Sequence, residues 1–284
     1  MKEQSRIALQ EFCKKYSRDH SIGDLTPTVC ELFGVREPAV CGAEAIAPVV
    51  DQAARTMGEG AMEKMVLFCC DAMGENQRDH FPEVFERIEK TSPFRIPSSA
   101  VMPSVTPVCY GTIFSGAAPA VHGIQKYEKP TLKIETLFDV FAAAGKNVAI
   151  VAMNNCSIDL IFRSRNVDYY SFRTDEQSFE CTLELIRKNN YDLIVSYMTG
   201  YDSKQHHSGC FSPQSTEEAR LGAERFEQLA TDMDKYYADY NRLLVFVPDH
   251  GGHVIADGTG THGFDIPEDM LVSHYYRLKA KSEC

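Results

Sequence analysis

Four short runs made almost entirely of apolar residues constrain this chain more than any other feature. The runs are Met65–Cys70, Val148–Met153, Leu193–Tyr197 and Leu243–Val247, and segments with helical patterns separate them. A strand that is apolar at nearly every position must be covered on both faces, as strands are in a parallel sheet that lies between two layers of helices. The sequence therefore predicts an α/β fold with a largely parallel central sheet.

The segments between these runs carry helix signals. The predicted helices cover His80–Lys90, Ile134–Ala144, the stretch from Thr174 through Lys188, and Ser215–Tyr240. Residues 1–62 show only short helical patterns and no chemistry-bearing motif. We therefore expect an N-terminal helical extension over residues 1–62, packed on a main domain of residues 63–284. The extension is also a candidate contact in a homo-oligomer.

Three of the predicted strands are followed by an aspartate. Asp71 follows the first run directly, Asp202 lies shortly after the third, and Asp249 comes two residues after the fourth. Parallel strands end at the same edge of a sheet, so we expect the three carboxylates to gather there. His206 lies four residues after Asp202, and one turn of helix would place both side chains on one face. His207 would then point elsewhere.

Histidines are concentrated in the same part of the chain. Five of the nine lie between His206 and His262; His250 adjoins Asp249 in PDHGGH, and His262 lies in the glycine-rich GTGTHGF. Taken singly, each residue fits a helix cap, a turn or a solvated side chain better than a ligand. Together, three aspartates and three histidines predict two metal sites with mixed ligands, which suit Zn²⁺ and tolerate Mn²⁺. His253 is expected to lie outside the ligand set.

A threonine before a predicted helix is the central residue of the candidate site. The extended stretch Phe94–Val105 leads into Thr106, and Pro107 opens a run that can be helical as far as Ser115. This pattern predicts Thr106 at the N-cap of a helix, where unpaired N–H groups and the helix dipole favour an anion such as phosphate. A threonine before proline is also an ordinary capping pair, and taken alone the cap is the better interpretation.

Charge and composition limit the class of protein. A net charge of −11 without a basic stripe argues against binding to nucleic-acid polymers or anionic membranes. No apolar run approaches the roughly 18 residues that span a bilayer. The N-terminus lacks a secretory signal and the ten cysteines form no CxxC pair, so we expect free thiols and a cytoplasmic location. An anionic substrate would need local positive charge, which favours bound metal.

The order and spacing of these motifs resemble the alkaline phosphatase superfamily, in particular its branch of type I phosphodiesterases and nucleotide pyrophosphatases. The similarity covers Met65 to about Gly263. It is carried by Asp71, Thr106, Ser115–Gly116, Pro119, His122–Ile124 (HGI), Asp202-x-x-x-His206, Asp249–Gly251 (Asp-His-Gly) and Thr261–Gly263 (Thr-His-Gly). The resemblance implies an alkaline-phosphatase-like three-layer α/β/α sandwich.

The resemblance also implies a function. It makes Thr106 the nucleophile of a metal-dependent hydrolase that cleaves phosphodiester or pyrophosphate bonds of small phosphate esters through a phospho-threonine intermediate. It implies two divalent ions, one held by Asp71, Asp249, His250 and Thr106 and the other by Asp202, His206 and His262. The alternatives are a phosphomonoesterase or phosphonate-ester hydrolase on the same site and, in a different class, a non-catalytic protein that binds metal or phosphate.

The segment after HGI departs from the family pattern. Many relatives have an asparagine there whose amide holds a nonbridging phosphate oxygen, whereas this chain offers Gln125 or Tyr127 as substitutes. A sulfatase is disfavoured, because Thr106 replaces its modified Cys or Ser and Tyr110 replaces the later Arg. His122 of the HGI motif is expected to be structural.

Overall fold

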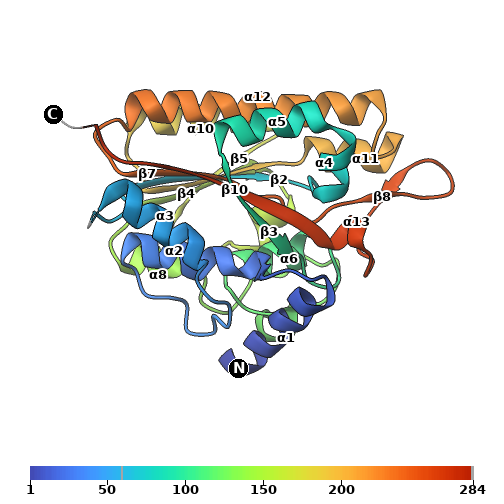
Figure 1. The fold of residues 1–284 in the computed structure, drawn as a ribbon, viewed down its shortest axis with the longest axis horizontal. Helices are drawn as coiled ribbons and strands as arrows, with labels where there is room; N and C mark the ends of the chain where they lie inside the picture. Colours follow the sequence, from blue (N-terminus) through green and yellow to red (C-terminus); the bar gives the residue numbers. More distant parts are fainter. Residues whose placement is uncertain (59, 283–284) are drawn as a thin grey trace.

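The computed structural model describes residues 1–58 and 60–282, and its centre is a sheet in the order β1-β3-β10-β7-β2-β6-β4-β5. The strands are β1 (His20–Ser21), β2 (Lys64–Cys70), β3 (Phe94–Ser99), β4 (Val148–Met153), β5 (Asp168–Phe172), β6 (Leu193–Met198), β7 (Arg242–Phe246) and β10 (Leu271–Lys279). A separate hairpin of β8 (His253–Val254) and β9 (Gly260–Thr261) projects from the body (Figure 1).

Helices cover both faces of the sheet (Figure 1). One layer contains α5 (Pro82–Thr91), α10 (Asp175–Lys188) and α12 (Pro213–Tyr236). The other contains α1 (Lys2–Lys15), η1 (Ile22–Asp24), α2 (Leu25–Phe33), α3 (Ala47–Met57), α6 (Thr106–Ile113), α7 (Pro119–His122), α8 (Leu137–Ala143) and α9 (Ser157–Ile161). Three more helices lie near the strand ends: α4 (Glu75–His80), α11 (Gly200–Ser208) and α13 (Pro267–Met270). No described helix is both long enough and apolar enough to cross a bilayer.

The apolar runs are buried on both faces, as predicted. Along β2, Leu67 belongs to the apolar cluster that contains residues of α2, α3, α6 and α8, whereas the adjacent Phe68 belongs to the cluster of α5, α10 and α12. Because successive side chains of a strand point to opposite faces, one continuous apolar run serves both layers. The predicted three-layer α/β/α arrangement is confirmed.

The strand directions place the carboxyl ends of four central strands at one edge. β2 is parallel to β6 and β7, and β4 is parallel to β6; Cys70 pairs with Met198, and Phe68 pairs with Phe246. Only β10, among the described strands of this sheet, runs against its neighbours β3 and β7. The residues that follow β2, β6 and β7 therefore meet at the same end of the sheet.

Several elements differ from the sequence prediction. The four predicted helices are present, with ends shifted by up to four residues, but β5 and β10 were not predicted. Residues 1–62 supply helices and also β1, which pairs with β3. Residues 1–62 are therefore not purely helical. The sequence could not reveal β1, because a strand of two residues is too short to show a periodicity. The division of the chain at residue 62 stays a prediction.

Truncation of Phe68 should test the central packing. Its side chain is fully buried, and its ring centroid lies 5.9 Å from that of Phe226 and 6.0 Å from that of Phe246. We expect Phe68→Ala to lower the free energy of unfolding by about 3–5 kcal/mol, because it leaves a cavity between sheet and helices. Urea denaturation measures this loss. The control Ile7→Ala, at a side chain that is 49% exposed, should change stability by less than about 0.5 kcal/mol.

Candidate active site

The first group of predicted ligands comes from the ends of β2 and β7. Asp71 follows β2 directly, and Asp249 and His250 follow β7. His250 Nε2 lies 3.4 Å from Asp71 Oδ1 and 3.3 Å from Asp249 Oδ2, and all three side chains are buried. The structure brings them together because β2 and β7 are parallel neighbours that end at the same edge.

The protons in this group point away from its centre. His250 Nδ1 lies 2.8 Å from the carbonyl oxygen of Gly251. A carbonyl only accepts, so Nδ1 carries the proton and the Nε2 of the neutral ring presents a lone pair to the two carboxylates. Asp249 Oδ2 is buried and has no hydrogen-bond partner among the described residues. Acceptors that face one another in this way require either a bound cation or added protons.

The second group joins α11 to the loop after β9. His206 Nε2 and His262 Nε2 each lie 3.3 Å from Asp202 Oδ1 and 3.1 Å from each other. His206 Nδ1 faces the carbonyl of Gly260 at 3.0 Å, and His262 Nδ1 faces the carbonyl of Ser104 at 2.9 Å. In the neutral form of each ring, Nε2 therefore presents a lone pair, again beside a carboxylate. Asp202 and His206 lie one turn apart on α11, as the spacing predicted.

The spacing of the donor atoms fits divalent ions. A tetrahedral ion with bonds of about 2.0–2.1 Å has neighbouring ligand atoms about 3.3–3.4 Å apart. Within the two groups, the shortest distances from a histidine Nε2 to another potential ligand atom are 3.1–3.4 Å, close to this value. The rings of His250 and His262 stack with centroids 4.0 Å apart, so the two groups adjoin. The residues present therefore fit two neighbouring ions of the zinc type.

Thr106 lies beside the first group. Its Oγ1 is 3.3 Å from Asp71 Oδ2 and 3.5 Å from His250 Nε2, and the residue is buried. The prediction that Thr106 is the N-cap is wrong by one residue: α6 begins at Thr106, and Val105 is the cap. Pro107 is compatible with the first and with the second position of a helix, so the sequence could not separate them. The hydroxyl makes no cap hydrogen bond and faces the ligands.

Without a bound cation, the first group resists carrying charge. Burial raises the pKa of Asp71 well above its ordinary value, and the charges of Asp249 and Asp202 raise it further. Burial raises the pKa of Asp249 to about 8 and lowers that of His250. In the second group, burial lowers the pKa of His262, but hydrogen bonding to Asp202 and the charge of Asp202 together raise it to about 9. The metal-free site therefore holds protons that a divalent ion would displace.

Two further residues orient the carboxylates. The hydroxyl of Tyr197 donates to Asp71, and Gln205 Nε2 donates to Asp202 Oδ1 at 2.8 Å. Neither residue was predicted from the sequence. Helix periodicity from Asp202 could have suggested Gln205, whereas Tyr197 lies on β6 and no local pattern relates it to Asp71. Both hydrogen bonds fix the rotamers of potential ligands, as outer-sphere groups do in metal sites.

Asp269 joins the two loops that carry the histidines. Its carboxylate accepts a hydrogen bond from the N–H of Phe264 at 2.9 Å and lies 2.7 Å from His253 Nδ1. Its carbonyl accepts from the N–H of Gly251 at 2.9 Å. Gly251 is required there, because a Cβ would lie 2.0 Å from the carbonyl oxygen of residue 268. One buried aspartate thus ties the loop after β7 to the loop after β9. His253 lies outside both ligand groups.

His207 and His122 have other partners. His207 is exposed, and its Nδ1 lies 2.6 Å from the carbonyl of Ser203, away from both ligand groups. His122 is buried; its Nδ1 accepts from the N–H of Ile124 at 3.2 Å, and its Nε2 lies 3.1 Å from Thr112 Oγ1. These contacts tie the HGI loop to α6, which is the structural arrangement that the sequence suggested.

A cavity of about 220 Å³ opens beside Thr106. Its walls come from the two ligand groups, from the segment after HGI and from the ends of β4 and β6: Asp71, Thr106, Tyr127, Lys129, Met153, Asn154, Cys156, Ser157, Tyr197, Thr199, Asp202 and Ser203. Of the two predicted substitutes for the missing asparagine, Tyr127 lines this cavity. Gln125 is exposed and is not part of its wall.

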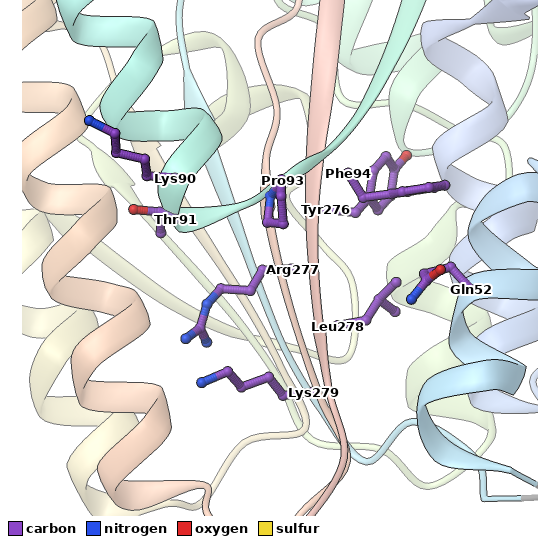
Figure 2. Close-up of a pocket in the computed structure, with 9 residues that line it drawn as sticks. All are labelled: Gln52, Lys90, Thr91, Pro93, Phe94, Tyr276, Arg277, Leu278 and Lys279. Carbon is purple, nitrogen blue, oxygen red and sulfur yellow. The ribbon is translucent and has the colours of Figure 1, made fainter.

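A larger cavity lies away from this chemistry. Figure 2 shows it between the end of β10, the start of β3 and helices α3 and α5, with a volume of about 430 Å³. Two of its three basic residues, Arg277 and Lys279, already pair with Asp234 of α12, each at 2.7 Å. No member of either ligand group lines it. We therefore place the candidate active site in the smaller cavity.

Comparison with solved structures identifies the fold, although no family model and no curated protein sequence matches the chain. Phosphonoacetate hydrolase from Sinorhizobium meliloti 1021, solved with phosphonoformate, is 18% identical with a TM-score of 0.53 over 72% of this chain and 61% of its own. Murine ectonucleotide pyrophosphatase/phosphodiesterase 5, solved with AMP, is 16% identical with a TM-score of 0.55 over 68% and 58%.

A third match is the C-terminal periplasmic domain of EptC from Escherichia coli, solved in complex with Zn; EptC of Campylobacter jejuni, which also matches, is a phosphoethanolamine transferase. The Escherichia coli domain is 14% identical, with a TM-score of 0.52 over 78% of this chain and 74% of that chain. At these identities the likeness establishes the fold: this chain has the α/β fold of the alkaline phosphatase superfamily, as its motifs indicated. It spans about three fifths of the length of the first two proteins.

Replacement of Tyr197 should weaken metal binding. Tyr197→Phe removes a hydrogen bond that orients Asp71, so we expect zinc affinity to fall about 10–100-fold in competition with a chelator. The control Tyr275→Phe removes a buried hydroxyl that has no hydrogen-bond partner among the described residues. It should bind zinc like the wild type. Unchanged zinc affinity in Tyr197→Phe would contradict the orienting role.

Metal removal should make stability fall as pH rises. The pKa of Asp249 is raised to about 8 and that of His262 to about 9, so above pH 7 the folded metal-free chain binds protons that the unfolded chain has released. Unfolding then becomes easier with increasing pH, by up to about 1.4 kcal/mol per pH unit for each such proton. The lowered pKa of His250 acts in the opposite direction only below its ordinary value near 6.5.

The melting temperature of chelator-treated protein should therefore be lower at pH 8.5 than at pH 7. Saturating Zn²⁺ should raise it more at pH 8.5, because the ion replaces the protons. Differential scanning fluorimetry with and without chelator measures both effects. A metal-free protein that is more stable at pH 8.5 than at pH 7 would show that these groups do not titrate as described.

Proposed function

We propose that this protein is a metal-dependent phosphoric ester hydrolase, which cleaves phosphodiester or pyrophosphate bonds with Thr106 as nucleophile. One observation carries the proposal: two groups of carboxylate and imidazole donor atoms with tetrahedral spacing adjoin, and a buried threonine hydroxyl lies beside one of them. Asp71, Asp249, His250 and Thr106 would hold one divalent ion, and Asp202, His206 and His262 the other. The mixed nitrogen and oxygen donors favour Zn²⁺ and accept Mn²⁺.

The residues around Thr106 suit in-line attack on phosphorus. A threonine hydroxyl is a weak nucleophile near neutral pH, and two divalent ions, when bound, would lower its pKa and stabilise charge on the leaving oxygen. Asp71 and His250 keep the hydroxyl beside the first ligand group, and the start of α6 adds the positive end of a helix dipole. The Thr106 oxygen bonds to phosphorus as the bond to the leaving group breaks, and water then hydrolyses the phospho-threonine.

The structural neighbours support a small phosphoryl compound as substrate. The phosphonoacetate hydrolase was solved with phosphonoformate and the murine phosphodiesterase with AMP. The second candidate function is therefore hydrolysis of phosphomonoesters or phosphonates at the same site. The nine described cysteines are all free, which agrees with the proposed cytoplasmic location in a reducing compartment.

Loss of the nucleophile should abolish turnover without unfolding the protein. With zinc-loaded protein and bis(p-nitrophenyl) phosphate, we expect Thr106→Ala to reduce kcat at least about 1000-fold. Zinc content and melting temperature serve as checks on folding. The control Thr231→Ala, on the exposed face of α12, should keep wild-type activity. Full activity in Thr106→Ala would show that another group attacks phosphorus.

The same assay separates the candidate reactions. Faster turnover of the diester than of p-nitrophenyl phosphate is expected for a phosphodiesterase, and the reverse order would favour the monoesterase. A protein that binds neither Zn²⁺ nor Mn²⁺ and turns over neither ester would contradict the enzymatic proposal.

A further inference from the structure

Lys129 is the one cationic side chain among the described residues that line the cavity beside Thr106. It lies in the segment after the HGI motif, where the asparagine of related enzymes is missing. The cavity wall also includes Asn154, in the loop that follows β4, and Ser157, the first residue of α9. Lys129 therefore places a positive charge in the cavity wall of a chain whose net charge is −11.

The contacts of Lys129 hold its ammonium group without neutralising it. Nζ donates to the carbonyl oxygen of Asn155 at 3.1 Å and lies 5.6 Å from the ring centroid of Tyr127. An ammonium has three donors, so this one backbone contact leaves donors for a ligand. Lys129 forms no ion pair within the described chain, whereas the nearby Lys126 pairs with Glu128 at 3.3 Å.

The charge of the proposed metal centre explains why a further cation matters. Two divalent ions carry four positive charges, and Asp71, Asp202, Asp249 and a Thr106 alkoxide would cancel them. The start of α6 contributes only about half a charge. An anionic substrate therefore meets little net positive charge from the centre itself, and Lys129 supplies the remaining full charge in the cavity wall.

We infer that Lys129 binds a second anionic group of the substrate, which lies beyond the phosphoryl group that Thr106 attacks. The preferred substrates are then compact phosphoryl compounds that also carry a carboxylate or a further phosphate. The volume of about 220 Å³ agrees with a compact substrate, because pockets for drug-sized ligands have about 300–1,000 Å³. The exposed amide of Asn154 offers a neutral donor at the same cavity. This inference rests on the proposed function.

Binding of two small phosphonates tests the inference without turnover. Zinc-loaded protein is titrated calorimetrically with phosphonoacetate, which has a second anionic group, and with methylphosphonate, which has none. We expect Lys129→Met to weaken phosphonoacetate binding about tenfold, as for loss of one charge-assisted hydrogen bond, and to change methylphosphonate binding less than about twofold. Lys129→Arg keeps the positive charge, so it should retain most of the preference for phosphonoacetate over methylphosphonate.

Lys126→Met is the matched control, because Lys126 lies three residues earlier, is exposed and does not line the cavity. It should bind both phosphonates like the wild type. Zinc content and melting temperature of each variant verify folding. Equal weakening of both ligands in Lys129→Met, or no weakening of either, would overturn the role of a second anionic group. Failure of the zinc-loaded wild type to bind either phosphonate would instead overturn the proposed function.

Discussion

The candidate site depends on one electrostatic constraint: six side chains direct carboxylate oxygens and imidazole Nε2 atoms at two adjoining points, where either protons or cations must balance them. Hydrogen bonds from Nδ1 to backbone carbonyls fix the tautomers of His206, His250 and His262. Without a bound cation, such acceptor atoms would move apart or bind protons. They stay together because strand ends and one short helix carry them, and those elements are anchored in the two apolar clusters.

The ligand groups could be predicted because their positions follow from local patterns. An apolar run identifies a buried parallel strand, and a polar residue directly after it must lie at the sheet edge, as for Asp71. The spacing of Asp202 and His206 needs only the geometry of one helical turn. These inferences use no information about distant parts of the chain, and the structure agrees with the arrangement that they predict.

The elements that escaped prediction depend on distant partners. β10 lies inside the sheet, yet its sequence is partly polar because Ser273 contacts Arg95 and Glu75 and Arg277 pairs with Asp234. No local period reveals such a strand, since its polar groups are satisfied by residues far away in the sequence. The roles of Asp269, Tyr197 and Lys129 were not predicted for the same reason: they depend on segments that are far apart in the sequence.

The two ligand groups differ in burial, and this difference determines from which side solvent can reach the site of the proposed reaction. Asp249 and His250 are fully buried beside Thr106, whereas His206 of the second group is exposed. In the proposed reaction, a leaving group or an incoming water would therefore reach the site from the side of α11, whereas the Thr106 side chain is buried and meets only the cavity. Lys129 and Asn154 line the same cavity as Thr106 and Asp202. In the proposed enzyme the charges of the metal-loaded centre would cancel, so the choice of substrate would fall to the segment after HGI and the loop after β4.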